Sequence, residues 1–557
     1  MDTTEQPRLT EPRLPARPAS PWIDTAGSLP TFAQSSRATA AILAFVAVFE
    51  FTVRSQQPFH TASADPLANF LGVAVPLAAA FVAASALYCP WRALLLVLAL
   101  TPLWNGAYIS WQIGSVQVIL QTVFVVALGI GAAIAWAKEE GVFAARSESA
   151  TSARTKGFDA FRLAAVAVAG FVGIAAVSTV ASPNVALSAT VLLHGILEPI
   201  ALAAILVFLR PSRRDLVMLG VALGVSVGLG TALNVIAALP TMTSLAAVQA
   251  NRLVFARASF YNVGLYAAVV ATTVPLVVAA VALRRSLNLP RWAVSLMVAV
   301  LAAGSAGLFF ALSKSAWIAT ASGTVLLLLF IMHSWRRRLA LVVASVAVST
   351  LFIPWPAVIL QISPSLNSGY RSAMVALVGE SRYDSWNPAT LAGRGSLTER
   401  FYAADAAVLM ALTNPVLGVG LDQFGVNYTN PAYRPPQAND FVDHAHSFFP
   451  EIGAELGLVA VTLVVVLYAA ALWAMWRVYR RARERLTRVL AAGLFASMIS
   501  WLVVATAFGC DIYRPDRDLS SDVVVAAVVL GAALALARTV RAEQSRRPTD
   551  GAPGVAS

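Results

Sequence analysis

Hydrophobic residues in this chain come in repeated blocks of about 17 to 25, separated by short polar and basic segments. A helix of that length covers the roughly 30 Å of hydrocarbon in a bilayer, at about 1.5 Å per residue. The blocks predict helices at residues 38–53, 67–88, 92–104, 113–136, 160–180, 187–209, 215–238, 262–283, 292–311, 315–332, 338–360, 455–476, 488–509 and 522–538. We therefore expect an all-α polytopic membrane protein with about 12–14 transmembrane helices and one long external loop that contains short helices.

Basic residues gather in alternate connections between these blocks, as expected if those connections face the cytoplasm. The main basic segments are residues 138–162, 210–214, 284–291, 336–338, 477–488 and the chain from 538 onward. This pattern places both termini in the cytoplasm. The predicted organisation is a disordered cytoplasmic tail (1–37), an N-terminal transmembrane bundle (38–360), a large external loop (361–454), C-terminal transmembrane helices (455–538) and a cytoplasmic tail (539–557).

The composition excludes a soluble globular protein, because 58% of residues are hydrophobic, 12% are charged and the mean hydropathy is +0.72. A net charge of +12 would suit a nucleic-acid binder, but the basic residues are scattered among loops that face the cytoplasm anyway. We expect no nucleic-acid partner and some attraction to anionic membrane lipids. Cys89 and Cys510 fall on opposite faces of the membrane, so no disulfide or cysteine metal site is expected.

Few ionisable residues lie at membrane depth. His194 and Glu198 are four residues apart, so they share one helix face and can hydrogen-bond each other. A structural pair is favoured over a proton relay. Glu50 lies near the outer end of the first predicted helix, where an interfacial position explains it.

The segment from about 361 to 455 is far longer than an ordinary connection and is rich in polar and aromatic residues. Its aromatic side chains suffice for a small packed layer, so we expect it to be ordered. Ser396 and Glu399 form a capping box for a helix that Asn414-Pro415 ends. The apolar positions at helical spacing in this helix, which we expect on or near the membrane surface, are Leu397, Phe401, Ala404 and Val408. Three glycines follow, at which the backbone can turn tightly or approach a ligand: Gly418, Gly420 and Gly425.

Two histidines, His444 and His446, stand shortly before the next predicted spanning helix, beside Asp443. Three interpretations compete for them: a metal pair with Asp443, surface residues without a role, or a histidine that acts as a general base. The residue types alone favour the surface interpretation.

The second half of the chain, from Asn251 to about Ala460, resembles the O-antigen ligase and polymerase superfamily. In that family the long loop ends in a pattern like H-N-x-x-L-x-x-x-x-E-x-G, which His446, Glu455 and Gly457 match. The segment ERFYAADAAVLMALTNPVLGVGLDQFG is similar to the family's arginine, amphipathic helix and P-l-l-G-v-G-x-x-x-F, which Arg400, Pro415, Gly418, Gly420 and Phe424 match.

Two upstream segments extend the likeness. RASFYNVGLYAAVV is similar to R-x-x-G-x-F-x-x-P-N-x-x-A, with Arg257 at the arginine, and SKSAWIA is similar to S-R-G-A-W-L-A. The chain departs from the family in the missing Gly and Pro-Asn upstream, and at Lys314 for Arg, Ser447 for Asn and Pro450 for Leu. These departures bear on the finer specificity.

The resemblance implies an inverting membrane glycosyltransferase of the bacterial inner membrane. It would move a glycan from a polyprenyl diphosphate donor to a hydroxyl of a glycan or lipid acceptor at the outer face. His446 would be the general base. The diphosphate would be held by Arg257, Arg400, Lys314, Arg394 and Arg252, with support from His444, Asp443, Glu455, Gly418 and Gly420.

No acidic triad with metal-ligand spacing accompanies these residues, so we expect no metal or other cofactor. Two alternatives stay open. Within the family, a polymerase that joins repeat units is not separated from a ligase that moves a finished glycan. From another class, a transporter would also suit the many helices.

Overall fold

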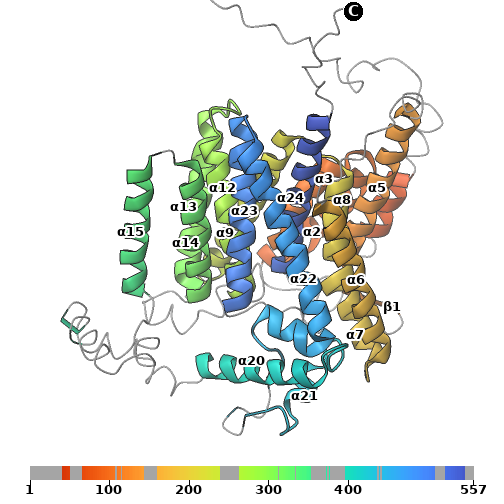
Figure 1. The fold of residues 1–557 in the computed structure, drawn as a ribbon. Helices are drawn as coiled ribbons and strands as arrows, with labels where there is room; N and C mark the ends of the chain where they lie inside the picture. The colour runs from red at the N-terminus through yellow and green to blue at the C-terminus, as the bar shows by residue number, and fades with distance from the viewer. Residues whose placement is uncertain are drawn as a thin grey trace, which may run out of the picture.

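The computed structural model describes residues 40–49, 66–106, 110–113, 116–143, 160–238, 263–311, 313–332, 334–352, 372, 375–376, 396–435, 438, 442–507 and 521–545. Apolar helices make up most of this part of the chain and stand side by side as a bundle (Figure 1). They are residues 40–49, α2 (Pro66–Tyr88), α3 (Pro90–Ala99), α4 (Thr101–Gly106), α5 (Leu120–Phe143), α6 (Ala160–Ala181), α7 (Val185–Val191), the π-helix η3 (Leu192–Leu197), α8 (Glu198–Phe208), α9 (Arg213–Ala238), α12 (Val263–Ala282), α13 (Arg291–Ala311), α14 (Lys314–Ile331), α15 (Trp335–Phe352), α22 (Phe448–Arg481), α23 (Arg485–Ala507) and α24 (Ser521–Ser545).

Among the described residues, 8 helical segments are long and apolar enough to cross a membrane. They are Ala160–Ala181, Val185–Phe208, Arg213–Ile236, Gly264–Ala282, Arg291–Leu308, Phe448–Arg481, Arg485–Thr506 and Val523–Gln544. Each of the remaining predicted blocks also coincides with a helix. The prediction of a helical polytopic membrane protein is confirmed, whereas spanning by these remaining helices stays a prediction.

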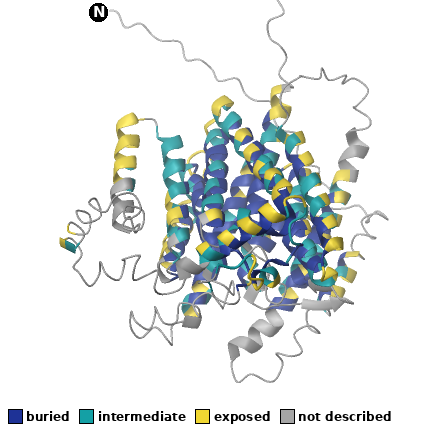
Figure 2. Cartoon of the chain, turned by 60° about the horizontal axis from the view of Figure 1, so that its bottom comes forward, coloured by how far each residue is buried: buried dark blue, intermediate teal, exposed yellow. Residues whose placement is uncertain are grey.

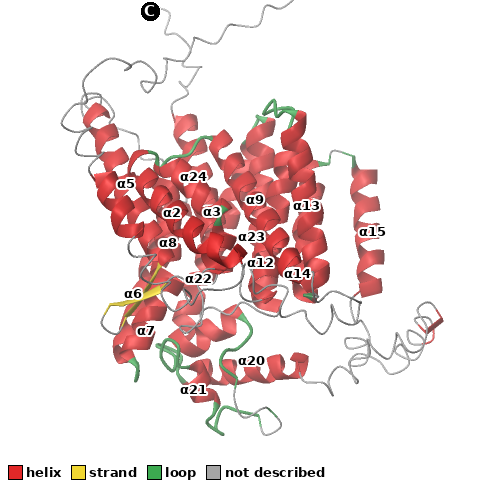
Figure 3. Ribbon diagram, turned by 180° about the vertical axis from the view of Figure 1, so that it is seen from behind, coloured by secondary structure: helices red, strands yellow, loops and turns green. Residues whose placement is uncertain are grey.

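The structure corrects the prediction in three places. The block expected as one helix at 113–136 begins as an antiparallel hairpin of β1 (Ser110–Ile113) and β2 (Val116–Ile119), and its helix starts only at Leu120 (Figure 3). The block at 92–104 is split into α3 and α4. The helix expected from 455 begins at Phe448, and it contains a break at Gly457.

Small residues allow the helices to approach closely, as is typical where lipid supplies no hydrophobic drive between helices. A Cβ at Gly131 of α5 would lie 1.9 Å from the Ala86 carbonyl oxygen of α2, and one at Gly531 of α24 would lie 2.7 Å from the Ala203 Cα of α8. Buried residues fill the middle of the bundle and exposed ones lie on its perimeter (Figure 2).

Charged residues tie several connections together at one end of the bundle. Arg213, which opens α9, pairs with Glu484 between α22 and α23, at 2.5 Å, and with Glu543 in the last turns of α24. The helices α20 (Ser396–Thr413) and α21 (Phe424–Tyr428) lie at the opposite end, and α20 runs across the bundle axis (Figure 1). These charged connections and the loop helices thus lie at opposite ends of the bundle, and which end faces the cytoplasm stays a prediction.

This sidedness gives the first prediction. In a variant with Cys89 and Cys510 replaced by Ser, Ala432→Cys should react with a membrane-impermeant thiol reagent added outside intact cells, and Ala542→Cys should react only after permeabilisation. Both alanines are exposed, so accessibility of the side chain does not separate them. The reverse labelling pattern would move every candidate site residue to the cytoplasmic face.

The predicted hydrogen bond between His194 and Glu198 is present. His194 Nδ1 lies 2.8 Å from Glu198 Oε1, and both side chains are buried. Thr122 of α5 donates to the same carboxylate oxygen at 2.5 Å, so the pair connects two helices. His194 belongs to η3, a π-helical turn of the kind often found near functional sites.

Candidate functional site

The long loop has a small hydrophobic core of its own, separate from the main bundle core. Its buried residues are Ala403, Ala406, Ala407, Met410, Phe424, Tyr428, Val442, Ala445 and Ala454. The predicted packed layer is therefore present, and α20 ends just before Asn414 as expected. The predicted apolar positions Phe401 and Val408 are not in this core but are 57% and 47% exposed. Alanines on the opposite face of α20 form the core instead, because they let α20 approach α22 closely.

Backbone hydrogen bonds hold the turn after α20 (residues 415–420) against the break in α22 (residues 454–458). We call this contact the glycine lock. Val419 N–H donates to the Ala454 carbonyl at 2.7 Å, and Gly420 N–H donates to the Glu455 carbonyl at 3.2 Å. Leu458 N–H, which would normally bond to Ala454 within the helix, donates to the Pro415 carbonyl at 2.8 Å. The helix thus gives up internal bonds at Gly457 and replaces them with bonds to the turn.

Three glycines make this lock possible, since all have positive φ: Gly418 (67°), Gly420 (111°) and Gly457 (84°). A Cβ at Gly418 would lie 2.2 Å from the Glu455 carbonyl carbon, and one at Gly457 would lie 2.6 Å from the Val416 carbonyl carbon. No side chain fits at either position.

We therefore expect Gly457→Ala to lower the thermal stability of the detergent-solubilised protein and to abolish its activity. The added methyl is strained by the backbone conformation and forces the turn away from α22. Gly173→Ala is the matched control, because Gly173 lies within α6 and a Cβ there meets nothing within 4 Å. A Gly457→Ala protein with the melting temperature of the Gly173→Ala protein would contradict this account.

Glu455 has a buried side chain that supports the same lock. Its Oε1 accepts the Phe424 N–H at 3.3 Å, at the start of α21. The Glu455 side chain thereby holds α21 against α22, and its supporting role in the site stays a prediction.

Two serines from distant helices fix the turn, and the sequence did not single them out. Ser178 of α6 donates to the Glu455 carbonyl at 3.3 Å and accepts the Leu421 N–H at 3.1 Å. Ser188 of α7 donates to the Leu421 carbonyl at 2.6 Å. Their only sequence signal is a polar residue at the end of an apolar helix, which is too common to indicate a contact some 240 residues away.

In the sequence, the two histidines lie between the turn that follows α20 and the start of α22. His444 is buried, and its Nδ1 lies 2.6 Å from Asp443 Oδ1. Its ring contacts the His446 ring edge-on, with 3.9 Å between the ring centroids. His446 is only partly buried and holds a left-handed backbone with φ of 53°, which is uncommon outside glycine. The carboxylate of Asp443 thus contacts the buried imidazole of His444, which in turn contacts the partly exposed imidazole of His446.

This order suits proton transfer by His446. Asp443 fixes the orientation of the His444 ring, and the edge contact limits the orientation of the His446 ring. The backbone strain at His446 is of the kind that persists where the surroundings hold a functional residue in place. Within the described part of the chain, no group of three or more His, Cys, Asp and Glu side chains is placed to hold a metal ion.

The predicted diphosphate-binding residues are placed only in part. Arg400 lies on α20 and is partly buried, and Lys314 opens α14. Arg252, Arg257 and Arg394 lie outside the described residues. Their approach to the histidines stays a prediction.

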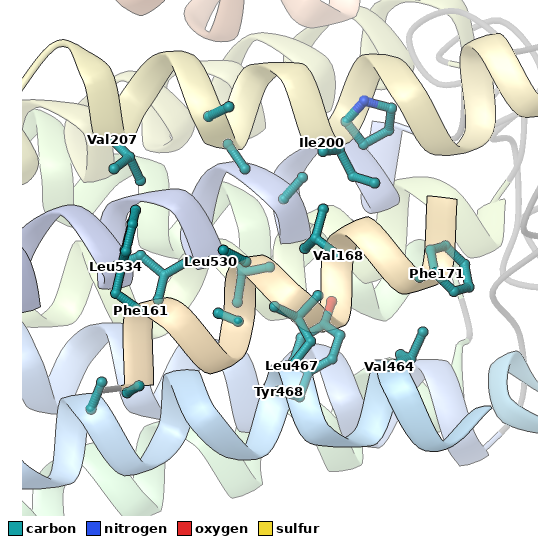
Figure 4. Close-up of a pocket in the computed structure, with 18 of the residues that line it drawn as sticks. Phe161, Val168, Phe171, Ile200, Val207, Val464, Leu467, Tyr468, Leu530 and Leu534 are labelled. Atoms are coloured by element: carbon teal, nitrogen blue, oxygen red, sulfur yellow. The ribbon is translucent and has the colours of Figure 1, made fainter. Parts of the chain in front are cut away.

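A groove of about 1040 Å³ runs along the bundle beside this site. Its walls come from α6, α8, α22 and α24, with Trp501 from α23, and Figure 4 shows its apolar lining. On the loop side it ends at Leu421, Phe448, Ile452 and Glu455. Phe448, two residues after His446, packs edge-on against Trp501 with 4.9 Å between ring centroids.

Residues 298–465 match a family model described as O-antigen ligase. That match runs from α13 through the loop, the glycine lock and both histidines into α22. Over these residues the chain resembles the O-antigen ligase and polymerase superfamily. This likeness and the apolar helices support a multi-pass membrane glycosyltransferase of the ligase or polymerase type in the bacterial inner membrane, for which the family implies a lipid-linked glycan donor and an acceptor. No curated protein matches the chain.

The residues that carry the likeness to the O-antigen ligases include those of the glycine lock. The motif residues Gly418, Gly420, Glu455 and Gly457 meet in one place, although they are separated by the length of the histidine segment. They hold the two ends of the segment 421–454 together, which restricts the positions of the two histidines within it.

Proposed function

We propose that this protein transfers a glycan from a polyprenyl diphosphate to an acceptor hydroxyl at the outer face of the membrane. The observation that carries the proposal is the position of His446. It is accessible, it is braced by His444 and Asp443, and it precedes by two residues the Phe448 that lines the loop-side end of an apolar groove. A polyprenyl chain in the groove would bring its diphosphate to this end.

His446 would act as the general base. It takes the proton of the acceptor hydroxyl as the hydroxyl oxygen bonds to the anomeric carbon, and the bond from that carbon to the diphosphate oxygen breaks. A single displacement inverts the anomeric configuration. The products are the glycosylated acceptor, the free polyprenyl diphosphate and a protonated His446 that releases its proton to solvent.

Arginines would stabilise the leaving diphosphate. Negative charge grows on its oxygens in the transition state, and a guanidinium offers two parallel donors with a permanent charge. Arg257 and Arg400 are assigned this role from their motifs, and Lys314, Arg252 and Arg394 would add positive charge. With this charge supplied by side chains, the reaction is proposed to run without a metal.

Reconstitution would test the proposal. Purified protein, a polyprenyl diphosphate-linked glycan and candidate acceptors are incubated with a chelator, and the glycosylated acceptor and free polyprenyl diphosphate are quantified. Formation of both in equal amounts supports the proposal. Activity that vanishes with chelator and returns with a divalent metal would replace the base assignment with the metal-pair interpretation.

The same assay separates ligase from polymerase. A polymerase joins donor repeats to one another without a further acceptor, whereas a ligase needs a lipid or other glycan acceptor. Uptake of a lipid-linked sugar into vesicles by an inactive His446→Ala protein would instead support the transporter alternative.

A further inference from the structure

The groove has a second end, away from the loop, and that end is strongly basic. Its lining there includes Arg477 and Arg481 of α22 together with Arg538 and Arg541 of α24. Arg477 and Arg481 are one helical turn apart, as are Arg538 and Arg541, so each pair shares a helix face. Because α22 and α24 pack against each other, the two pairs flank one opening.

The described residues that line the groove include more basic than acidic side chains. Glu455 is the one acidic residue among the described groove-lining residues, and it lies at the loop-side end. On α22 it precedes Arg477 by 22 residues, which corresponds to about 30 Å along the helix.

Between its two ends the groove is apolar. Phe161 and Val168 of α6, Val207 of α8, Leu467 of α22 and Leu534 of α24 line it (Figure 4). Since its length matches the hydrocarbon thickness, each half is as deep as one leaflet. A diacyl lipid with its headgroup at the arginines would thus fill the half nearest to them.

We propose that the arginine end of the groove binds an anionic phospholipid from the adjacent leaflet, the cytoplasmic one in the topology given above. The lipid phosphate would lie among the four arginines, which donate charge-assisted hydrogen bonds to its oxygens, and the acyl chains would lie along Phe161, Val207 and Leu534. The loop-side half of the groove stays open for the donor's chain. The proposal does not rest on the glycan-transfer reaction.

Lipid retention measures this site directly. The protein is reconstituted in nanodiscs that contain equal amounts of phosphatidylglycerol and phosphatidylcholine, then extracted in mild detergent, and the bound lipid is quantified by mass spectrometry. Wild type should retain phosphatidylglycerol over phosphatidylcholine by about tenfold. The variant with Gln at residues 477, 481, 538 and 541 should retain the two lipids equally.

Two controls separate a built site from general attraction to basic loops. Arg336 and Arg337 are exposed at the start of the edge helix α15, and their replacement by Gln should leave the preference unchanged. Ala165→Trp, at an exposed residue that lines the groove on α6, should reduce lipid retention with every arginine in place. Because Ala165 is exposed, this variant tests the site even if the arginine variant fails to fold.

Two results would overturn the proposal. One is equal retention of both lipids by the wild type, and the other is an unchanged preference in a folded arginine variant or an unchanged amount of retained lipid in the Ala165→Trp variant. Either result would leave the arginines as ordinary basic residues at the cytoplasmic ends of α22 and α24. Glycan transfer is measured separately on the same samples, so its failure would not be mistaken for the failure of lipid binding.

Discussion

His446→Ala should lose about a hundredfold or more in the rate of glycan transfer, the usual contribution of a positioned general base. Without the imidazole, the acceptor hydroxyl has no group to take its proton as it attacks. Protein yield and melting temperature should change little, because His446 is only partly buried and lies outside both hydrophobic cores. The measurement is the initial rate with purified protein in detergent, with donor and acceptor at saturation.

Asp443 and His444 should respond differently, because they are positioning residues. His444 is buried against His446 and bound to Asp443, so His444→Ala and Asp443→Asn loosen the base without removing it. We expect milder losses of rate than for His446→Ala. His444→Gln, which keeps a polar side chain of similar length, should recover part of the loss seen in His444→Ala.

The pH profile distinguishes a base from a structural residue. An imidazolium cannot accept a proton, so the wild-type rate should fall at acidic pH, where the imidazole becomes protonated. The residual activity of His446→Ala should lack this fall. Equal losses and equal pH profiles for substitution of His444 and His446 would remove His446 from the role of base.

The helices were predictable because each block of apolar residues must satisfy its backbone hydrogen bonds internally within the membrane. This constraint acts locally, so one sequence is enough to read it. The helix prediction is wrong at the hairpin of Ser110–Ile113 and Val116–Ile119, because the apolar residues of the hairpin continue into α5 without a polar boundary. The prediction also missed the break at Gly457, where backbone groups of α22 bond to Pro415, Val419 and Gly420 instead of to one another.

The face of α20 shows a second limit. Its apolar spacing predicted a helix correctly, but the large residues Phe401 and Val408 are exposed and the small residues Ala403 and Ala407 are buried. The apolar spacing therefore predicted the helix but not which of its faces packs against α22. The exposed apolar face agrees with the expected position of α20 at the membrane surface, where such a face can contact the interface.

For the site, motif spacing identified the glycines, Glu455 and His446 but not their contacts. The lock between Gly418 and Glu455, and its bracing by Ser178 and Ser188, depend on residues that are adjacent only in the folded chain. Asp443 stands beside both histidines in the sequence, and the structure pairs it with His444. Spacing along the chain does not decide between the two partners, because the pairing depends on how this loop turns.

Arg400→Ala should lower the rate of transfer by about a hundredfold or more, as expected when one donor to a developing anion is removed. Arg257→Ala should have an effect of the same size, since its motif assigns it the same role. The loss should be mainly in kcat, because the negative charge on the diphosphate oxygens grows as the bond to the sugar breaks. Arg400→Lys should recover only part of the rate, because an ammonium keeps the charge but lacks the two parallel donors.

Arg434→Ala is the matched control for Arg400→Ala, because Arg434 lies in the same loop, is also partly buried and matches no motif. It should transfer glycan at nearly the wild-type rate. All variants are compared at equal protein amounts after gel filtration, with saturating donor, so that folding and binding do not obscure the chemical step. If Arg400→Ala matched Arg434→Ala in kcat, Arg400 would be a residue of loop packing, and the charge on the leaving diphosphate would have to be neutralised by Arg257 and its neighbours without α20.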